Sequence, residues 1–261
     1  MLSKKSKIFK EVIRMISERL EKIKLLMKEH KLDVYYITTS DDHMSEYIPE
    51  YYKILRYFSG FTGSLGTLLI TLDKSYLFVD GRYHIQADEE TRGSGIEVMH
   101  LGLPKVLEPL EFLKTNYDGK TIGLDGKLTS TTFVNMLTKQ GNNVVSIDLA
   151  SGIMEDRAPL SKDMLFSLDE SYCGKSTKDK LKEVKYCLSG KTHILTNLES
   201  IAYLLNLRGN DIANTPVFLS FMVFTKDDVY LFINKERLNE EILMRLYDDG
   251  IAVREYDEYY D

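Results

Sequence analysis

The stretch FSGFTGSLGT, residues 58–67, is the part of the sequence that most resembles a ligand-binding loop. Gly60, Gly63 and Gly66 recur at every third position, beside serine and threonine residues. Glycine-rich loops bind phosphates when they lead into a helix, because the N-terminal amides of that helix then face the anion. Here the spacing is G-x-x-G-x-x-G, the lysine of a P-loop is missing, and the strand-like run TLLITL follows. We therefore interpret the glycines as a structural turn that permits positive φ angles and close backbone approach before a strand.

The polar segment DDHMSE, residues 41–46, has the residue types of a hydrolytic metal site. Such a site needs several His, Asp or Glu side chains that converge on one ion. The sequence contains no H-E-x-x-H pattern, its five histidines are scattered, and no serine lies in a G-x-S-x-G motif. We therefore predict a solvated polar loop at this segment, and we expect neither metal ligands nor catalytic residues in the chain.

Two charged turns are better candidates for a cleft or an interface. VDGRYH, residues 79–84, presents Arg82 at the end of an expected strand, and NLRGND, residues 206–211, places Arg208 and Asp211 around a glycine. The charges in these turns can pair with each other or with another domain. A local ion pair at the surface is worth under about 1 kcal/mol. We favour an interdomain or interface role because both turns flank strands that should be rigid.

The elements that position these segments occur twice along the chain. YLFVD begins at residue 76 and YLFIN at 230, while GIEV begins at 95 and GIAV at 250, so the two offsets differ by a single residue. This agreement indicates a duplicated domain. Hydrophobic periodicity predicts the elements of the first copy: a helix at 8–30, strands at 34–39, 67–72 and 75–80, and a helix at 81–90. The second copy has a strand at 192–197, a helix at 198–206, strands at 216–225 and 229–234, and a helix at 235–246.

The second copy ends earlier than the first. After GIEV the first copy continues with helix-like and strand-like segments at 106–117, 120–125, 130–140 and 143–148, whose counterparts would lie beyond Asp261. We therefore expect an α/β fold with two similar domains in tandem. The domains are predicted at residues 1–155 and 156–261, the second one incomplete, so that the chain is expected to be a fragment of a longer protein. Within the polar linker region 151–180, a helix should begin near Ser176.

Composition argues against two kinds of partner. The net charge of −6 comes without a basic block, which predicts no binding to nucleic acid or to an anionic membrane. No apolar run approaches the roughly 20 residues that cross a bilayer, and the N-terminus lacks the features of a signal peptide. We expect a soluble, cytoplasmic protein.

Six motifs resemble, in order, the N-terminal half of cytosolic Xaa-Pro aminopeptidase (aminopeptidase P) of the three-domain type. They are HMSEY at 43–47, FSGFTGSLGTLLIT at 58–71, VDGRYHIQA at 79–87, EDRAP at 155–159, IAYLLNLRGND at 201–211 and TPVFLSF at 215–221. The resemblance implies two tandem creatinase/prolidase N-terminal-like domains, each a mixed β-sheet flanked by helices. In that family a C-terminal pita-bread catalytic domain follows them, and it is absent from these 261 residues.

The resemblance also implies how the intact enzyme works. The catalytic domain of the family holds two divalent metals, usually manganese, which activate water against the bond before a penultimate proline. None of those ligands falls on a position of this chain, so we expect no cofactor here and no peptide hydrolysis by the chain alone. The N-terminal domains of the family are associated with a homodimer and with the walls of the active-site cleft. The residues in matching motifs, and thus the candidates for a cleft or interface, are His43, Glu46, Tyr47, Arg82, Tyr83, Arg208 and Asp211.

Two alternatives remain at this stage. The chain could be a free-standing binding or scaffold protein made only of creatinase-like domains. It could also belong to another pita-bread enzyme, such as a prolidase or creatinase relative, although these have one N-terminal domain of this kind and the duplication counts against them.

Overall fold

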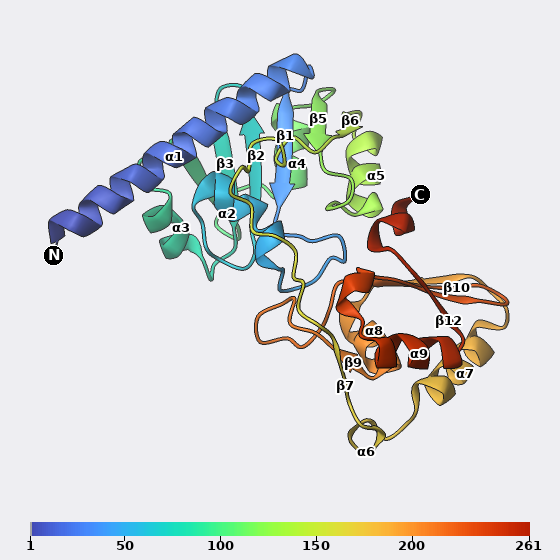
Figure 1. The fold of residues 1–261 in the computed structure, drawn as a ribbon. Helices are drawn as coiled ribbons and strands as arrows, with labels where there is room; N and C mark the ends of the chain where they lie inside the picture. Colours follow the sequence, from blue (N-terminus) through green and yellow to red (C-terminus); the bar gives the residue numbers. More distant parts are fainter. Residues whose placement is uncertain (1) are drawn as a thin grey trace. The chain divides into compact units, whose positions relative to one another are not determined.

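The computed structural model describes the backbone of residues 2–261 and the side chains from residue 9 onward. The chain forms two compact units, Met1–Ala158 and Pro159–Asp261, each with its own main β-sheet (Figure 1).

The sheet of the first unit has six strands in the order β4-β3-β2-β1-β5-β6. β1 pairs antiparallel with β2 and parallel with β5, β2 pairs antiparallel with β3, and the outer pairs β3–β4 and β5–β6 are parallel. The sheet is therefore mixed, as the sequence predicts. The strands are β1 (Val34–Thr38), β2 (Thr67–Thr71), β3 (Ser75–Val79), β4 (Ile96–His100), β5 (Thr121–Leu124) and β6 (Asn143–Ser146).

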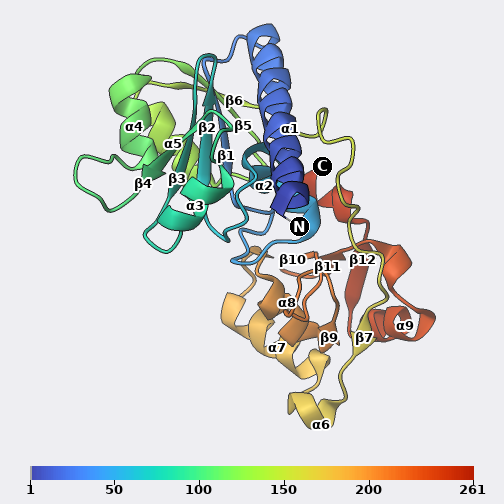
Figure 2. The same cartoon turned by 90° about the vertical axis from the view of Figure 1, so that its left-hand side faces the viewer.

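Helices cover both faces of this sheet (Figure 2). α1 (Leu2–Glu29) and α2 (Ile54–Ser59) lie on one face, and α4 (Pro109–Asn116) and α5 (Thr131–Lys139) lie on the other. The predicted period of α1 is visible in its burial, since Ile16, Leu20, Ile23 and Met27 are buried whereas Phe9 is 42% exposed. Burying a side chain of this size fully contributes about 1.5–3 kcal/mol.

The opposite face holds a second apolar cluster, in which strand residues Val34, Leu69 and Phe78 pack with Phe112 and Leu113 of α4. This cluster arises from the alternation of side chains along each strand, which sends every second residue to the same face. A short helix, α3 (His84–Glu90), follows β3 and leads to β4.

The sheet of the second unit has four strands in the order β12-β11-β10-β8. Three helices lie along one of its faces (Figure 2), and a two-stranded sheet of β7 and β9 lies beside it. The strands are β7 (Phe166–Ser167), β8 (His193–Leu195), β9 (Leu207–Arg208), β10 (Phe221–Phe224), β11 (Val229–Phe232) and β12 (Ile251–Arg254). The helices along the sheet are α7 (Thr177–Leu188), α8 (Leu198–Leu205) and α9 (Glu240–Asp248), and the four-residue α6 (Glu170–Cys173) precedes them.

The predicted duplication is confirmed by strand order, strand sense and register. β8, β10, β11 and β12 repeat β1, β2, β3 and β4, with two antiparallel pairs followed by one parallel pair in both units. Ser75 pairs with Ile96 in the first unit, and Val229 pairs with Ile251 at the corresponding place in the second. Counterparts of β5 and β6 are missing among the described residues of the second unit.

Two predicted elements are wrong in extent. The strand expected at 216–225 begins only at Phe221, because the residues before it form hydrogen bonds with the turn that contains Asp211. The Leu219 amide donates to the Asp211 carboxylate, and the Asp211 amide donates to the Val217 carbonyl. The helix expected at 235–246 is interrupted at Leu238, which is extended (φ −99°, ψ 122°). A 3₁₀ turn, η2 (Lys235–Arg237), precedes this residue and α9 follows it.

The N-caps explain where these helices begin. Asn239 accepts a hydrogen bond from the Ile242 amide at 2.8 Å and starts α9. Ser176 accepts one from the Asp179 amide at 3.1 Å and starts α7, as the sequence predicts. A side-chain oxygen at this position satisfies a backbone donor that the helix itself leaves without a partner. Throughout the described part of the chain, no helix combines the length and the apolar character needed to cross a membrane.

Candidate functional site

The carboxyl ends of five strands of the first unit lie at the same end of the sheet. These strands are β1, β3, β4, β5 and β6, which all run in the same direction. β2 runs opposite to both β1 and β3, β4 is parallel to β3, and both β5 and β6 are parallel to β1. Ligand sites of open α/β sheets occur at this end. The loops at 39–47, 60–66 and 80–83 follow or precede these strand ends, and we refer to them together as the carboxyl-end surface.

The glycine loop of this surface is a structural turn, as predicted. Gly60 ends α2 with φ +76°, and its amide donates to the Arg56 carbonyl at 2.8 Å. A Cβ atom on Gly63 would lie 2.1 Å from the Phe61 ring, so this ring can occupy its place only beside a glycine. The Gly66 carbonyl accepts the Thr39 amide at 3.0 Å, which ties the loop to the end of β1.

Arg82 forms an exposed ion pair with Asp80 in the turn after β3. Its Nε donates to Asp80 Oδ1 at 3.0 Å and its Nη2 donates to Oδ2 at 2.7 Å. This pair, together with the Arg82 amide, lowers the pKa of Asp80 from 3.8 to about 2. The hydroxyl groups of Tyr83 and Ser64 are hydrogen-bonded at 2.7 Å, and the Tyr83 ring meets the Phe61 ring edge-on. Tyr83 therefore joins this turn to the glycine loop.

The polar loop after β1 differs from the prediction of a solvated loop. Asp41 is buried, and its Oδ1 accepts the His43 amide at 3.0 Å and the Ser45 amide at 2.9 Å. His43 is 6% exposed, and its ring lies 3.4 Å from the Asp42 carboxylate. The carboxylate of Asp41 folds the loop back on itself, which is why the first half of the segment is buried.

The second half of that loop remains at the surface. Glu46 is exposed, and Tyr47 is 57% exposed. The hydrogen-bonded Asp80 carboxylate is the main cause that raises the pKa of Arg82, and the charge of Glu46 adds to it. The structure thus places Arg82 and Tyr83 together in one turn of the carboxyl-end surface and Glu46 in an exposed position of another of its loops, while His43 is buried.

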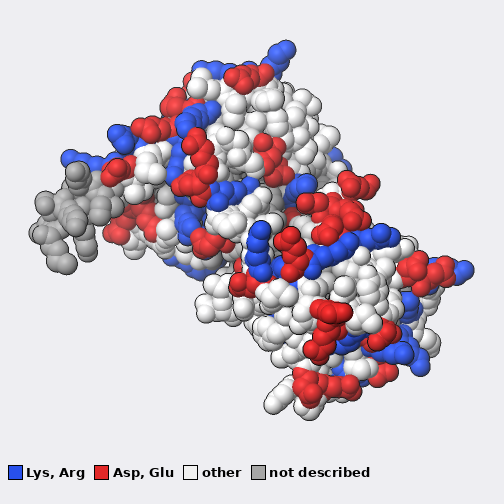
Figure 3. Space-filling view, viewed as in Figure 1, with Lys and Arg blue, Asp and Glu red and all other residues white. Residues whose placement is uncertain are grey.

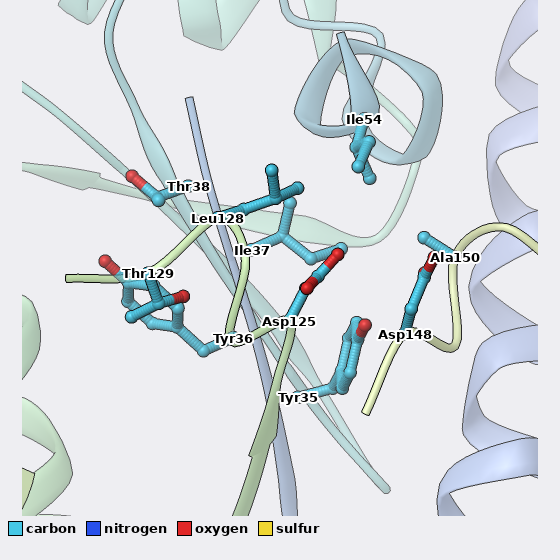
Figure 4. A pocket seen from close by; sticks show the side chains of 10 residues that line it. All are labelled: Tyr35, Tyr36, Ile37, Thr38, Ile54, Asp125, Leu128, Thr129, Asp148 and Ala150. Carbon is cyan, nitrogen blue, oxygen red and sulfur yellow. The ribbon is translucent and has the colours of Figure 1, made fainter. Parts of the chain in front are cut away.

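A small cavity lies at the ends of β1, β5 and β6 (Figure 4). Asp125 and Asp148 flank Tyr35 in this view, and Tyr35 donates to the Ile147 carbonyl and accepts the Leu149 amide. Burial, and secondarily the charge of Asp148, raises the pKa of Asp125. The cavity measures about 20 Å³, which is enough for about one water molecule and not for a peptide. The cavity therefore has no room for a peptide substrate beside Asp125 and Asp148.

In the second unit, the two predicted residues of the RGND turn do not pair with each other. Arg208 donates to the carbonyls of Ala202 and Leu207, at 2.8 and 2.9 Å. Asp211 instead forms a buried, two-bond ion pair with Arg237: Nη1 donates to Oδ2 at 2.7 Å, and Nη2 donates to Oδ1. Sequence reasoning missed Arg237 because it is distant along the chain and lies in the segment expected to be an uninterrupted helix.

The part of the chain that the structure describes contains no candidate metal site. No three His, Cys, Asp or Glu side chains are grouped closely enough to hold an ion. The residues present here therefore do not fit the dinuclear metal centre that the family resemblance implies. On the face shown in Figure 3, acidic and basic side chains are intermingled rather than separated into areas of one sign.

Comparison with protein families identifies both units. Residues 19–158 and residues 156–261 each match a model described as "Creatinase/Prolidase N-terminal domain". Over 94% of the chain, it is 37% identical to the "Probable Xaa-Pro aminopeptidase P" of Coprinopsis cinerea. Over 92% of the chain, it is 33% identical to the "Xaa-Pro aminopeptidase 1" of Dictyostelium discoideum. The chain spans 41% of the length of each of these relatives.

A solved structure agrees with the sequence relatives. The X-prolyl aminopeptidase of Caenorhabditis elegans, described as "a cytosolic enzyme with a di-nuclear active site", superposes with a TM-score of 0.88 at 25% identity. The superposition covers 94% of this chain and 43% of the nematode enzyme. Since the two family matches together extend over residues 19–261, the chain belongs to the creatinase/prolidase N-terminal domain family.

Proposed function

We propose that the chain is the noncatalytic N-terminal portion of a metal-dependent Xaa-Pro aminopeptidase. Residues 1–155 act as the first domain and residues 156–261 as the second, which continues in a longer protein. The observation that carries this proposal is the nematode superposition, which takes in 94% of this chain but only 43% of the enzyme. The reacting centre then belongs to a catalytic domain outside these residues. That domain would hold two divalent metal ions, and we propose that both are manganese.

The intact protein would remove the N-terminal residue from peptides with a penultimate proline. We assign Glu46, Tyr47, Arg82 and Tyr83 to a cleft wall or an interface, because all four belong to loops of the carboxyl-end surface and Glu46 and Tyr47 are exposed there. The buried His43 would support this wall from below. We propose that Arg208 and Asp211 support a second wall or interface from within, because Asp211 is buried in its ion pair with Arg237 and Arg208 is bonded to backbone carbonyls. The assembly that we propose is a homodimer. The description of the nematode enzyme as cytosolic supports a cytoplasmic location.

A chimera tests the proposal directly. The region of the Coprinopsis cinerea relative that aligns with this chain would be replaced by residues 1–261, and hydrolysis of an Xaa-Pro peptide would be measured with manganese. A matched control is the relative with the same region deleted. We expect the chimera to hydrolyse the peptide and the deletion to be inactive. A folded chimera without activity above that of the deletion would refute the proposal.

The scaffold alternative predicts different results. A scaffold needs no catalytic domain, so the chimera would be as inactive as the deletion, while the chain alone would be folded and monodisperse. The isolated chain would also be assayed with the same peptide and manganese. We expect no turnover above background, and clear turnover would contradict the assignment as a noncatalytic portion.

A further inference from the structure

A second, larger cavity of the first unit lies between α1, the segment around α2 and residues 154–158, and it measures about 340 Å³. This volume falls within the roughly 300–1,000 Å³ of small-molecule sites. Ile16 and Met154 in its lining are buried, whereas the charged groups around it reach solvent. Residues 156–158 belong to the EDRAP motif, to which neither the fold nor the proposed function assigns a role.

The charge of this cavity is opposite to that of the chain. Four basic residues line it against two carboxylates, whereas the chain as a whole carries −6. The basic residues are Arg19, Lys53, Arg56 and Arg157, and the carboxylates are Glu50 and Asp156. A concave site lined by one sign of charge concentrates counter-ions of the other sign.

Two of the four cations share one carboxylate, which offsets one of their two charges. Lys53 and Arg56 both donate to the carboxylate of Glu50, and these contacts lower the pKa of that group. With four basic residues and two carboxylates the lining keeps a net positive charge, and Arg19 and Arg157 are the cations in it that do not contact Glu50.

Arg19 and Arg157 are held in place by neutral partners. The Arg19 guanidinium stacks 3.5 Å over the Tyr57 ring and donates through Nη1 to the Tyr57 carbonyl at 2.9 Å. The Arg157 guanidinium stacks 3.5 Å over the Tyr51 ring and donates through Nε to the Tyr51 carbonyl at 2.8 Å. Within the described residues, neither has a carboxylate within 4.0 Å.

Both guanidinium groups retain hydrogen-bond donors. An arginine side chain has five N–H bonds. Arg19 uses one of them in the bond to Tyr57, and Arg157 uses two, since its Nη1 also donates to Ser151 at 2.7 Å. The stacking fixes the planes of the groups in advance, which lowers the entropic cost of using the remaining donors.

We propose that this cavity binds a small molecule through a doubly charged oxyanion, either a phosphate group or a pair of carboxylates. A single arginine recognises a carboxylate or a phosphate through two parallel N–H···O bonds. The apolar side chains of Ile16 and Met154 then contact the rest of the ligand. The site consists of residues of the first unit only, so the proposal is independent of the catalytic function proposed above.

The test uses inorganic phosphate and succinate as separate probes at constant ionic strength. Binding would be measured by calorimetry and by the NMR signals of the arginine Nε–H groups in the wild-type chain. We expect saturable binding of at least one probe, with shifts confined to Arg19 and Arg157. Preference for one probe identifies the ligand group as phosphate or carboxylate.

Variants separate this role from a structural one. Arg19→Gln should weaken binding at least tenfold, which corresponds to about 1.4 kcal/mol. Arg14→Gln is the matched control on the same helix, because Arg14 is exposed, pairs with Glu18 and does not line the cavity. Equal binding by Arg19→Gln and wild type would overturn the proposal. The proposal would also be overturned if neither phosphate nor succinate bound saturably to the wild-type chain. The NMR measurement on the wild type tests this without any variant, so it remains decisive even where a variant fails to fold.

Discussion

The buried ion pair between Asp211 and Arg237 should be the most sensitive electrostatic contact of the second unit. The side chains are 1% and 3% exposed, and the carboxylate has three donors: two from Arg237 and the Leu219 amide. Arg237→Met removes two of them and leaves a buried carboxylate with a single hydrogen bond. Breaking a buried pair from one side costs about 3–5 kcal/mol, which is a large part of the roughly 5–15 kcal/mol that stabilises a domain.

The exposed pair of Asp80 and Arg82 is a matched control for this experiment. It has the same chemistry and also two side-chain bonds, but its side chains are 33% and 63% exposed. Arg82→Met should therefore cost less than about 1 kcal/mol. The free energies of unfolding would be measured by urea denaturation, with hydrogen exchange of the β10 and β11 amides to report on the second unit alone.

A double variant distinguishes loss of a partner from loss of packing. Replacing both members, as Asp211→Leu with Arg237→Met, removes the uncompensated charge, and such replacements of buried pairs are often neutral. We expect the double variant to be more stable than Arg237→Met alone. If Arg237→Met costs no more than Arg82→Met, or if the double variant is the less stable of the two, the reasoning is refuted.

Three further predictions concern a close contact and two carboxyl groups. Gly209→Ala should destabilise the second unit by about 1–3 kcal/mol, because its Cβ would lie 2.8 Å from the Phe218 Cβ and 3.0 Å from a backbone oxygen; Gly81→Ala, which meets open space, should be neutral in the same thermal melt. Asp125→Asn should raise the free energy of unfolding at neutral pH, because folding raises the pKa of this carboxyl and so disfavours its charge. That gain should shrink in acid, where the wild-type group becomes protonated, and a constant gain across pH would contradict this cause. Asp80, with a pKa lowered to about 2, should contribute stability above pH 3.8, and this stability should be lost as the pH falls from 3.8 to 2. An NMR titration midpoint near 3.8 would show that the ion pair does not form in solution.

The fold was largely predictable because the chain contains two copies of the same elements, and the elements predicted in one copy can be compared with those predicted in the other. YLFVD and YLFIN occupy corresponding strands, β3 and β11. Because the offset between the copies is nearly constant, β3 pairs with β4 in the same register as β11 pairs with β12. Element ends were less predictable where tertiary contacts replace local ones. An apolar run such as PVFLSF reads as a strand, but the Asp211 carboxylate takes a backbone amide that a sheet would otherwise use.

The local structure of the carboxyl-end surface was predictable in its exposed half. Strand ends, turns and charges at Arg82 and Tyr83 follow from local sequence, and so does the structural role of the glycines. Burial of His43 and Asp41 did not follow, since a polar sequence gives no indication that a carboxylate will bind the backbone of its own loop. The pairing of Asp211 with Arg237 depends on where a helix is interrupted, which hydrophobic periodicity alone does not locate.

The strand order of the two units also bears on how the chain folds as it is synthesised. In the first unit, β1 to β4 pair within residues 34–100, whereas β5 and β6 join the free side of β1 only after residue 120. The second unit shows the same four strands in the same order forming a sheet with its own buried residues. Pairing of nearby strands precedes pairing of distant ones, because closing a longer loop costs more entropy. We therefore expect the four-strand arrangement to form first in both units, so that the apolar strands of the first unit are already paired on the ribosome before its last two strands have been made.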